Sequence, residues 1–566
     1  MWLRNLFFLG VLFAGASALI GALFPSQVPP RLQHADVQVT LADDFPAAVA
    51  RVDAVFRKEW QREGLKPAGR ADDLAIARRL SLGLTGTIPS LQEVRQFEAL
   101  PEKERIARWL AGILADRRYG DYFAERFARA YVGTEDGPFI VYRRRRFVAW
   151  LSDEFMRNRP YDQLTRDLIS SRGLWTDVPA TNFVTVTFDQ EKKRPDPERL
   201  AGRVSRAFLG IRIDCAQCHD HPFEPWSQKD FRSLAAFFSE ARQGFTGIYD
   251  ELAANGKFEF EVENKKTKQK EIIAPKAPEA LELMPSHGTR RAQLAGWITH
   301  PKNPYFARAT VNRVWALMFG RPLVDPVDNL PVKRSDDGRL AAADADAKRG
   351  EVADDASDER RAHPALEVLA EDFVAHGYDM RRLINLIVAT QVFQLDSGAN
   401  HELTDQHYSA WAAFPISRLR PEQVAGSLLQ AAAVETIDGD SHILTQFIRN
   451  NEVRDFVRIY GDTGEDEFDS RGGTIPQRLL LMNGPLVREK TKDALFNAST
   501  RIGQQAPTDR AAVETAYLAV LTRRPTAEEA EHFASRLDGT KRNERSQRME
   551  DLYWTLLNAT EFSWNH

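Results

Sequence analysis

The sequence predicts a mainly α-helical protein, a multi-helical body of two domains with a small β-hairpin insertion between the halves. Three observations lead to this fold class. Apolar residues recur at helical spacing over most of the chain. At 566 residues the chain is too long for one compact core. Alternation of apolar and polar residues with period two, the pattern of a strand, is clearest in one short central segment, residues 257–263.

The composition is that of an ordinary globular protein. Its hydrophobic fraction of 43% is sufficient to build cores. The 76 basic and 80 acidic residues give a formal net charge of -4. Because the two signs nearly balance, no nucleic-acid partner is expected.

The first residues have the pattern of an export segment. One basic residue, Arg4, precedes an uncharged run over residues 6–24, and Ala16–Ala18 offers a small-residue cleavage site. The run is nearly as long as the roughly 20 residues that span a bilayer. Residues 1–24 are therefore predicted to be a signal anchor, or alternatively a cleaved signal peptide, and residues 25–44 a linker. The remainder would lie outside the cytoplasm, in the periplasm, tethered to the inner membrane.

The region that follows, residues 45–240, is predicted to be a helical domain. Its apolar periodicity predicts helices over residues 45–63, 74–84 and 106–131. Ser90 and Glu93 have the spacing of a capping box, so a further helix is expected to begin there. A related pattern of helix, Pro turn and capped helix surrounds residues 521–529, and shared turn chemistry explains it without a duplication.

Residues 241–285 are predicted to be a β-containing connector, in which the strand at 257–263 pairs with residues 269–273. A second helical domain is expected over residues 286–566. Within it, residues 335–361 are acidic, rich in Ala and Asp and almost free of large apolar side chains. That composition predicts a mobile surface loop.

Both cysteines of the chain lie in one motif, Cys215-Ala-Gln-Cys218-His219. Two thiols one helical turn apart can add to the two vinyl groups of a haem, and the adjoining histidine then reaches the iron. Covalent haem attachment takes place outside the cytoplasm, where the chain is expected to be. The leading interpretation is therefore a haem c bound by Cys215 and Cys218, with His219 as a ligand of the haem iron.

The sequence offers no clear sixth ligand for such an iron. His221 is too close to the motif to fold easily over the opposite haem face. Low-ranking candidates further along the chain are Met284, His287, Met318, His363 and Met482. Each of these residue types is more often a core or surface residue than a ligand, and a five-coordinate iron is equally compatible with the sequence.

Two other interpretations of the motif remain open. Zinc or another metal could be held by Cys215, Cys218 and a nearby histidine, with a fourth ligand such as His363. The two cysteines could instead form a disulfide, either redox-active or a local staple, although no strand–helix–strand pattern surrounds them.

Charged residues near the motif have two interpretations each. Asp220 or Glu224 could orient an imidazole, or could form the turn and cap the helix that follows. The basic run Arg143–Arg146 could bind haem propionates through its guanidinium groups, but a solvated helix face is the simpler interpretation. The chain contains no Gly-x-Ser-x-Gly or His-Glu-x-x-His motif.

The segment Cys215–Phe223 resembles the planctomycete cytochrome-like domain of unknown function, which is usually followed by a second planctomycete domain of unknown function. Further segments extend the resemblance over nearly the whole chain after residue 44. For the first domain these are residues 80–86, 119–120 and 158–162, and for the second they are residues 303–309, 311–315, 319–326, 363–366, 481–485 and 561–566.

The resemblance implies export and a c-type haem, and it implies no established activity. Proteins of this kind resemble ones found beside exported sulfatase-like partners, which suggests a redox or accessory role in polysaccharide breakdown. This chain departs from the usual pattern in its acidic insertion before His363 and in Ala362, where a serine is common. Both departures weaken a functional role for His363.

The leading functional hypothesis is an exported electron-transfer protein with a redox protein as partner. One alternative is a non-haem scaffold or interaction protein with a structural Cys-x-x-Cys, and another is a metal-dependent carbohydrate hydrolase. Haem predicts a pocket of apolar residues over His219. The scaffold predicts packed cysteines, and the hydrolase predicts carboxylates converging on a metal.

Overall fold

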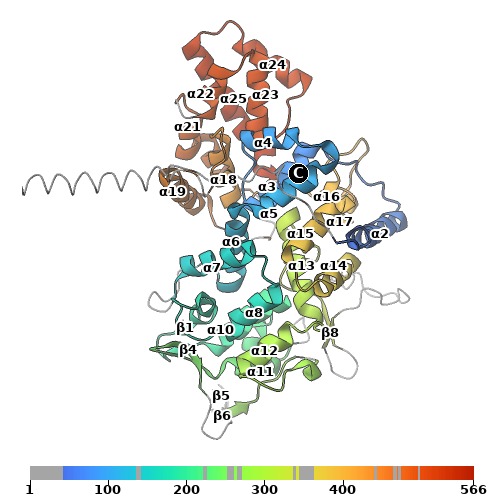
Figure 1. Ribbon diagram of the computed structural model, residues 1–566, viewed down its shortest axis with the longest axis vertical. Coiled ribbons are helices and arrows are strands. Elements are labelled where there is room, and N and C mark those ends of the chain that lie inside the picture. Colours follow the sequence, from blue (N-terminus) through green and yellow to red (C-terminus); the bar gives the residue numbers. More distant parts are fainter. Residues whose placement is uncertain are drawn as a thin grey trace, which may run out of the picture.

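Figure 1 shows a computed structural model of the chain. It describes residues 42–134, 142–220, 226–251, 260–263, 270–278, 280–334, 340–342, 363–438, 441, 443–462, 464, 468, 473–494 and 497–566. The predicted export segment 1–24, most of the linker 25–44 and most of the acidic loop 335–361 lie outside these residues, as do His221 and Glu224. Within the described ranges, no helix has both the length and the apolar character needed to cross a bilayer.

The described part is mainly α-helical, which confirms the predicted fold class. Helices of the first half are α2 (Phe45–Glu63), α3 (Asp73–Thr85), α4 (Leu91–Ala99), α5 (Arg105–Ala115), α6 (Arg117–Val132), α7 (Arg144–Met156), α8 (Tyr161–Ser170), α9 (Asn182–Thr185), α10 (Pro197–Val204) and α11 (Gln228–Ala235). Short helical turns of the first half are η2 (Glu102–Glu104), η3 (Pro179–Thr181), η4 (Ser205–Leu209), η5 (Asp214–Gln217) and η6 (Ala236–Phe238).

The second half continues in the same style. Its helices are α12 (Arg290–Ile298), α13 (Pro304–Phe319), α14 (Pro364–Ala375), α15 (Met380–Ala389), α16 (Gln391–Gln394), α17 (Asp405–Ser409), α18 (Pro421–Ala431), α19 (Ile443–Tyr460), α20 (Ile475–Asn483), α21 (Pro485–Thr491), α22 (Ala498–Gln505), α23 (Asp509–Leu521), α24 (Ala527–Leu537) and α25 (Arg542–Leu557), with the turns η7 (Leu281–Leu283) and η9 (Thr560–Ser563).

The described strands form only small antiparallel pairs. They are β1 (Phe188–Asp189) with β2 (Arg194–Pro195), β3 (Ala241–Gly244) with β4 (Gly247–Asp250), β5 (Phe260–Glu263) with β6 (Lys270–Ile273), β7 (Val332–Arg334) with β8 (Leu340–Ala342), and β9 (Ser417–Arg418) with β10 (Trp564–Asn565). The β5–β6 pairing, in which Phe260 faces Ile273, confirms the predicted hairpin. The β3–β4 hairpin was not predicted, and β8 places three residues of the predicted acidic loop in a strand.

Local signals set most helix boundaries. The helix predicted over residues 45–63 is α2, and it ends where Gly64 takes a left-handed conformation with φ 65°. Both predicted capping patterns are present, Ser90 with Glu93 at α4 and Thr526 with Glu529 at α24. The region 106–131 is helical, as predicted, and it forms two helices because the chain breaks between α5 and α6.

The break is made by Asp116, which has an extended backbone and ends α5. Its side chain accepts a hydrogen bond from the backbone N–H of Arg118 at 2.8 Å, which caps α6. An aspartate in an Ala- and Arg-rich run does not by itself reveal such a break. The consequence is that α6 can leave the axis of α5 and pack along α7.

Helices from the two halves of the chain share one hydrophobic core. The buried helix α13 packs against α3, α14 packs against α2, and α12 packs against α8. In Figure 1 the yellow-green helices α13 and α15 accordingly lie between the blue and teal helices of the first half. The two predicted domains therefore meet through packed side chains rather than through a flexible connection alone.

Two buried arginines of α3 fasten residues 562–566 to the first half of the chain. Arg78 donates to the carbonyl of Phe562 at 3.1 Å. Arg79 donates to the carbonyls of His566 at 2.8 Å and of Leu395 at 2.7 Å. Both arginines are at most 1% exposed. The end labelled C in Figure 1 consequently lies among the blue helices of the first half.

A carboxylate in the same region, Glu561, should make stability sensitive to acid. Burial alone would raise the pKa of Glu561, but hydrogen bonds and charge from His566 and Arg523 outweigh it and lower the pKa to about 2. A lowered folded pKa stabilises the protein above the unfolded pKa, and this stability is lost as the pH falls through the folded pKa. We therefore expect Glu561 to contribute about 3 kcal/mol at pH 7 and to lose that contribution between about pH 4.5 and pH 2.

Urea unfolding at a series of pH values tests this expectation. A Glu561→Gln variant should be less stable at pH 7 and should lose less stability across the same acid window than the unsubstituted chain. Glu528→Gln, at an exposed position of α24, is the matched control and should leave the pH profile unchanged. Parallel pH profiles for Glu561→Gln and the unsubstituted chain would contradict the assignment.

A buried ion pair attaches the β connector to the helical body. Arg291 of α12 and Asp250 of β4 form a two-pronged pair at 2.6 and 2.9 Å, and their side chains are at most 1% exposed. Arg291 also donates to the carbonyls of Ile169 and Ser171 at the end of α8. Arg172, which is largely exposed, adds a second contact to Asp250 at 2.9 Å. One carboxylate thus links β4, α8 and α12.

Candidate functional site

The segment that leads into the cysteine motif is buried, as its apolar sequence predicts. Helix α10 passes into the π-helical turn η4, a widened form of helix that is frequent at functional sites. Gly210 then ends the turn in a left-handed conformation with φ 62°. Its neighbours Leu209 and Ile211 are at most 2% exposed. These contacts fix the position at which the chain emerges at the surface.

The motif itself lies on the exposed turn that follows. The backbone of Cys215 is part of η5, and Cys218 directly follows η5 as an exposed free thiol. His219 is also exposed, and its Nδ1 lies 2.7 Å from the carbonyl oxygen of Asp220. A carbonyl oxygen only accepts, so Nδ1 must carry the proton in this contact. The Nε2 atom of a neutral His219 then keeps its lone pair available for a metal.

Asp220 combines two of the roles considered for it. Its backbone carbonyl orients the His219 ring, whereas its carboxylate accepts from the backbone N–H of Gln228 at 2.8 Å. The Gln228 side chain returns to the carbonyl of Gln217 at 3.0 Å. Through these bonds α11, which begins with a Ser227 capping box, holds the motif turn from its other side.

A polar cleft of about 210 Å³ adjoins the turn. Asp214 and Gln217, both in η5, contribute to its wall. Four arginines also line it, namely Arg199, Arg203, Arg206 and Arg313. The first three follow one another at spacings of four and three residues, which places them along one face of α10 and η4. That spacing is a sequence signal of the cleft, which the cysteine motif alone does not reveal.

The two aspartates of the cleft, Asp328 and Asp214, differ in how strongly nearby arginines stabilise their negative charge. Arg206 and Arg212 both hold Asp328, at 2.9 and 2.7 Å. Burial would raise the pKa of Asp328, but these guanidinium groups and Arg313 lower it. Although Asp214 stands on an exposed turn, its carboxyl faces the cleft wall, where limited hydration raises its pKa against the charge of Arg206.

Two known protein families match parts of this chain. Residues 51–243 match PSCyt2, described as a protein of unknown function (DUF1549), and residues 290–335 and 352–453 match PSD1, described as a protein of unknown function (DUF1553). The chain carries a PSCyt2 domain followed by a PSD1 domain. This confirms the family resemblance and the domain order inferred from the motif segments. No curated protein and no solved structure matches the chain.

Within the PSCyt2 domain, Gly202 of α10 lies close to the motif turn. A Cβ atom at Gly202 would lie 2.1 Å from Asp214 Oδ1. We expect Gly202→Ala to displace the Asp214 carboxylate and to lower the free energy of unfolding by less than about 1 kcal/mol, since Asp214 is exposed and its side chain can move aside. Urea unfolding measures the change.

A second substitution separates this steric effect from helix propensity. In an Asp214→Ala background the same Gly202→Ala change should be neutral, or stabilising by up to about 1 kcal/mol, because alanine is the better helix former. Equal effects in both backgrounds would show that the Asp214 contact is not what requires glycine at position 202.

The candidates for a sixth iron ligand lie in several environments. Met284 is half-buried at the end of η7, and His287 is exposed. Met318 is fully buried in α13, and Met482 is half-buried in α20. Among the described residues, no hydrogen bond, ion pair or ring contact joins any of them to His219.

His363, the remaining candidate, has a structural role at the start of α14. Its Nδ1 accepts from the backbone N–H of Ala365 at 3.2 Å, which caps the helix. Its Nε2 lies 3.1 Å from Glu59, and its ring lies against Phe56 with the centroids 5.0 Å apart. Both nitrogens are therefore engaged between α2 and α14.

The basic run Arg143–Arg146 is more ordered than a solvated face. Arg144 forms a two-pronged pair with Glu125 of α6 at 2.8 and 2.9 Å. Arg143 lies over the Trp175 ring, 5.0 Å from its centroid, and Arg146 donates to the carbonyl of Thr176. These contacts attach α7 to its surroundings.

One cluster in the described part has a donor set that a metal could use, and the sequence did not reveal it. Asp44, Asp372 and His376 bring their ligand atoms within 4.8 Å of one another. Arg382 donates to both carboxylates, at 2.9 Å to Asp372 and 3.1 Å to Asp44. The guanidinium group already supplies the positive charge, so the cluster is an ion-pair network between α2 and α14.

The environment of the motif suits a haem in part. An exposed thiol and an imidazole with a fixed tautomer are the donors that attachment and ligation require. The adjoining cleft, by contrast, is polar and smaller than sites that enclose drug-sized ligands. It differs from the apolar pocket predicted over His219, and its arginines fit carboxylates rather than a macrocycle.

Proposed function

We propose that this PSCyt2–PSD1 protein is an extracytoplasmic c-type haem protein that transfers electrons. The observation that carries the proposal is the arrangement of Cys218 and His219 on an exposed turn. The thiol is free, and the imidazole is oriented by the Asp220 carbonyl with Nε2 available. A scaffold role for the motif would favour packed cysteines, and Cys218 is not packed.

In this proposal Cys215 and Cys218 would hold the haem, each through a thioether bond formed when its S–H adds across one vinyl group, so that no atom is lost. His219 would ligate the haem iron. Bound there, a haem supplies reversible one-electron transfer. The guanidinium groups of Arg199 and Arg203, which line the polar cleft, are suited to the negatively charged propionates.

The proposal includes a compartment and partner proteins. Export through residues 1–24 would bring the thiols to the compartment in which haem c is attached. A redox protein would exchange electrons at the exposed turn. A role beside a sulfatase-like protein in polysaccharide breakdown rests on the family resemblance.

A second candidate is a non-haem binding protein in which the two cysteines form a short disulfide staple. The polar lining of the cleft beside η5 favours this alternative, because it lacks the apolar surface that a macrocycle buries. In that case Cys218 would be oxidised in the exported protein.

The deciding experiment is a visible spectrum with a pyridine haemochrome assay. The full chain is expressed in a host that matures c-type cytochromes, and the purified protein is denatured before the assay. We expect haem to remain with the denatured chain. A colourless protein from a host that matures a control cytochrome would refute the proposal, and thiol titration would then test for the disulfide.

A further inference from the structure

A second cleft, much larger than the first, lies where the two family domains meet. It has a volume of about 880 Å³ and is formed by α6 of the PSCyt2 domain together with α18 and α19. Its lining contains five carboxylates and six arginines, namely Arg118, Arg126, Arg129, Arg449, Arg454 and Arg458. Neither domain alone supplies the whole set.

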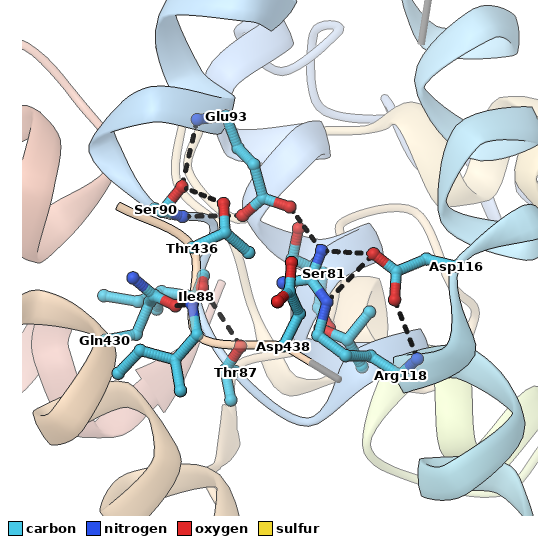
Figure 2. A network of polar contacts seen from close by, with 12 residues as sticks. Ser81, Thr87, Ile88, Ser90, Glu93, Asp116, Arg118, Gln430, Thr436 and Asp438 are labelled. Carbon is cyan, nitrogen blue, oxygen red and sulfur yellow. Dashed lines mark hydrogen bonds and ion pairs between the residues drawn. The ribbon is translucent and has the colours of Figure 1, made fainter. Parts of the chain in front are cut away.

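The arginines contributed by α6 are paired. Figure 2 shows Arg118 between Glu93 and Asp116, in a buried network that continues through Ser90 to Thr436. Arg126 forms an ion pair with Glu422 of α18 in the same way. Arg129 pairs with Asp462. These contacts compensate the inner charges and fix one wall of the cleft against the other.

Arg449 of α19 differs from these arginines. Its described hydrogen bond goes to the carbonyl of Ile437 at 3.4 Å, and no carboxylate among the described residues lies within ion-pair distance of it. Burial and the nearby charge of Arg118 lower the pKa of Arg449, against the charges of Asp121, Asp438 and Asp116. The cleft thus holds a half-buried guanidinium group that lies near another cation.

Two further arginines extend this positive surface along α19. Arg454 and Arg458 are exposed. Arg454 donates to a neutral acceptor, Asn451 Oδ1, at 2.6 Å, and Arg458 forms an exposed ion pair with Asp455 at 3.2 Å. They follow Arg449 by five and nine residues, which corresponds to about 8 and 14 Å along a helix that rises about 1.5 Å per residue. Positive charge therefore occupies two places in the cleft, one inner and one at the mouth.

The rest of the lining is suited to hydroxyl groups. Asp121 and Asp438 offer carboxylate oxygens that accept hydrogen bonds, and the apolar contribution comes chiefly from Tyr122, Val453 and Val457. Asp121 already accepts from Arg117 at 3.0 Å and from Ser152 at 2.6 Å, and Asp438 accepts from Ser441 at 3.1 Å. A carboxylate can accept several hydrogen bonds, so the hydroxyl groups of a ligand can donate to these oxygens as well.

We propose that this cleft binds an acidic oligosaccharide whose two oxyanion groups, sulfate or carboxylate, lie about 8–14 Å apart. Arg449 binds the inner oxyanion and Arg454 with Arg458 the outer one, because guanidinium groups pair with such oxygens in two-pronged fashion. The inference is independent of the haem proposal, since it rests on residues outside the cysteine motif.

The unpaired charge of Arg449 makes a test possible in which binding and stability change in opposite directions. Arg449→Gln removes a half-buried cation that burial and the charge of Arg118 both disfavour, so the melting temperature of the free protein should rise. The same substitution removes a charged hydrogen-bond donor from the ligand site, and affinity should fall about 10- to 100-fold. A residue with a purely structural role would not separate the two effects in this way.

Calorimetric titration of the full chain with sulfated di- and tetrasaccharides, and with matching uronic-acid oligosaccharides, measures the affinity and distinguishes sulfate from carboxylate. The desulfated sugars and inorganic sulfate alone should bind much more weakly. Arg510→Gln, at an exposed arginine of α23 that pairs with Glu531, is the matched control and should bind like the unsubstituted chain. Absence of binding by both acidic series, or unchanged affinity in Arg449→Gln, would overturn the proposal.

Discussion

A chain with both Cys215→Ala and Cys218→Ala is expected to retain no haem after denaturation, while its fold remains intact. The two thioether bonds would be the only covalent links to the cofactor, so their loss should abolish retention. Cys218 is exposed and supports no part of the core, and truncation of an exposed side chain changes stability by less than about 0.5 kcal/mol. Haem staining of a denaturing gel and thermal unfolding measure the two quantities.

Variants of single residues sharpen this prediction. Cys218→Ala alone should lower the yield of attached haem and change the haemochrome spectrum, because one vinyl group stays unreacted. His219→Ala should keep the covalent bonds and lose the axial nitrogen, which alters the spectrum of the folded protein. His287→Ala, at another exposed histidine, is the control and should behave like the unsubstituted chain. Retained haem in the double-cysteine variant would contradict covalent attachment through the motif.

The largest expected loss of stability follows from Asp250→Asn. The substitution removes the negative charge that Arg291 holds at 2.6 and 2.9 Å, and leaves a guanidinium group with 0% exposure unpaired. Removing one partner of a buried ion pair typically costs about 3–5 kcal/mol. We expect a loss of this size in urea unfolding, together with faster proteolysis in the region of β3 and β4.

Two controls distinguish the buried charge from the general loss of a contact. Arg172→Gln removes the exposed partner of the same carboxylate and should cost less than about 1 kcal/mol. Replacing the whole pair, with Arg291→Met and Asp250→Leu together, should be far less destabilising than Asp250→Asn alone. If the double replacement were the more damaging change, the ion pair itself would be stabilising and the desolvation argument would fail.

The sequence predicted those elements whose cause is local. Helix α2 could be placed because its apolar residues recur at helical spacing and Gly64 ends it. The start of α4 could be placed because the capping box needs only Ser90 and Glu93. The β5–β6 pairing followed from alternation on both sides of one turn. In each case the determining residues lie within a few positions of one another.

Elements fixed by distant contacts were not predictable in the same way. The break at Asp116 depends on a side chain that caps α6, and an identical aspartate on an exposed helix face would leave the helix continuous. The pair of Asp250 with Arg291 joins residues 41 positions apart, and neither residue has a distinctive sequence context. Buried charges of this kind are invisible to apolar periodicity.

In the candidate site, too, the part formed by contiguous residues was predictable and the part formed by distant residues was not. The cysteine motif was found because all its reactive groups are contiguous, and its exposure was not foreseen. The cleft beside it was missed because its walls come from η5, α10, α13 and Asp328. Of its members, only the arginine series Arg199, Arg203 and Arg206 left a periodic signal in the sequence.

The hydrogen bonds between α3 and residues 562–566 affect how the chain folds while it is being synthesised. Synthesis proceeds from the first residue onward, so Arg78 and Arg79 emerge long before the carbonyls of Phe562 and His566 that they bind. Until those acceptors arrive, the two guanidinium groups would resist burial, and α3 would lack its final packing. The chain would therefore complete its tertiary structure only after residues 562–566 have been made, and a PSCyt2 domain produced alone would lack the partners that let α3 enter the core.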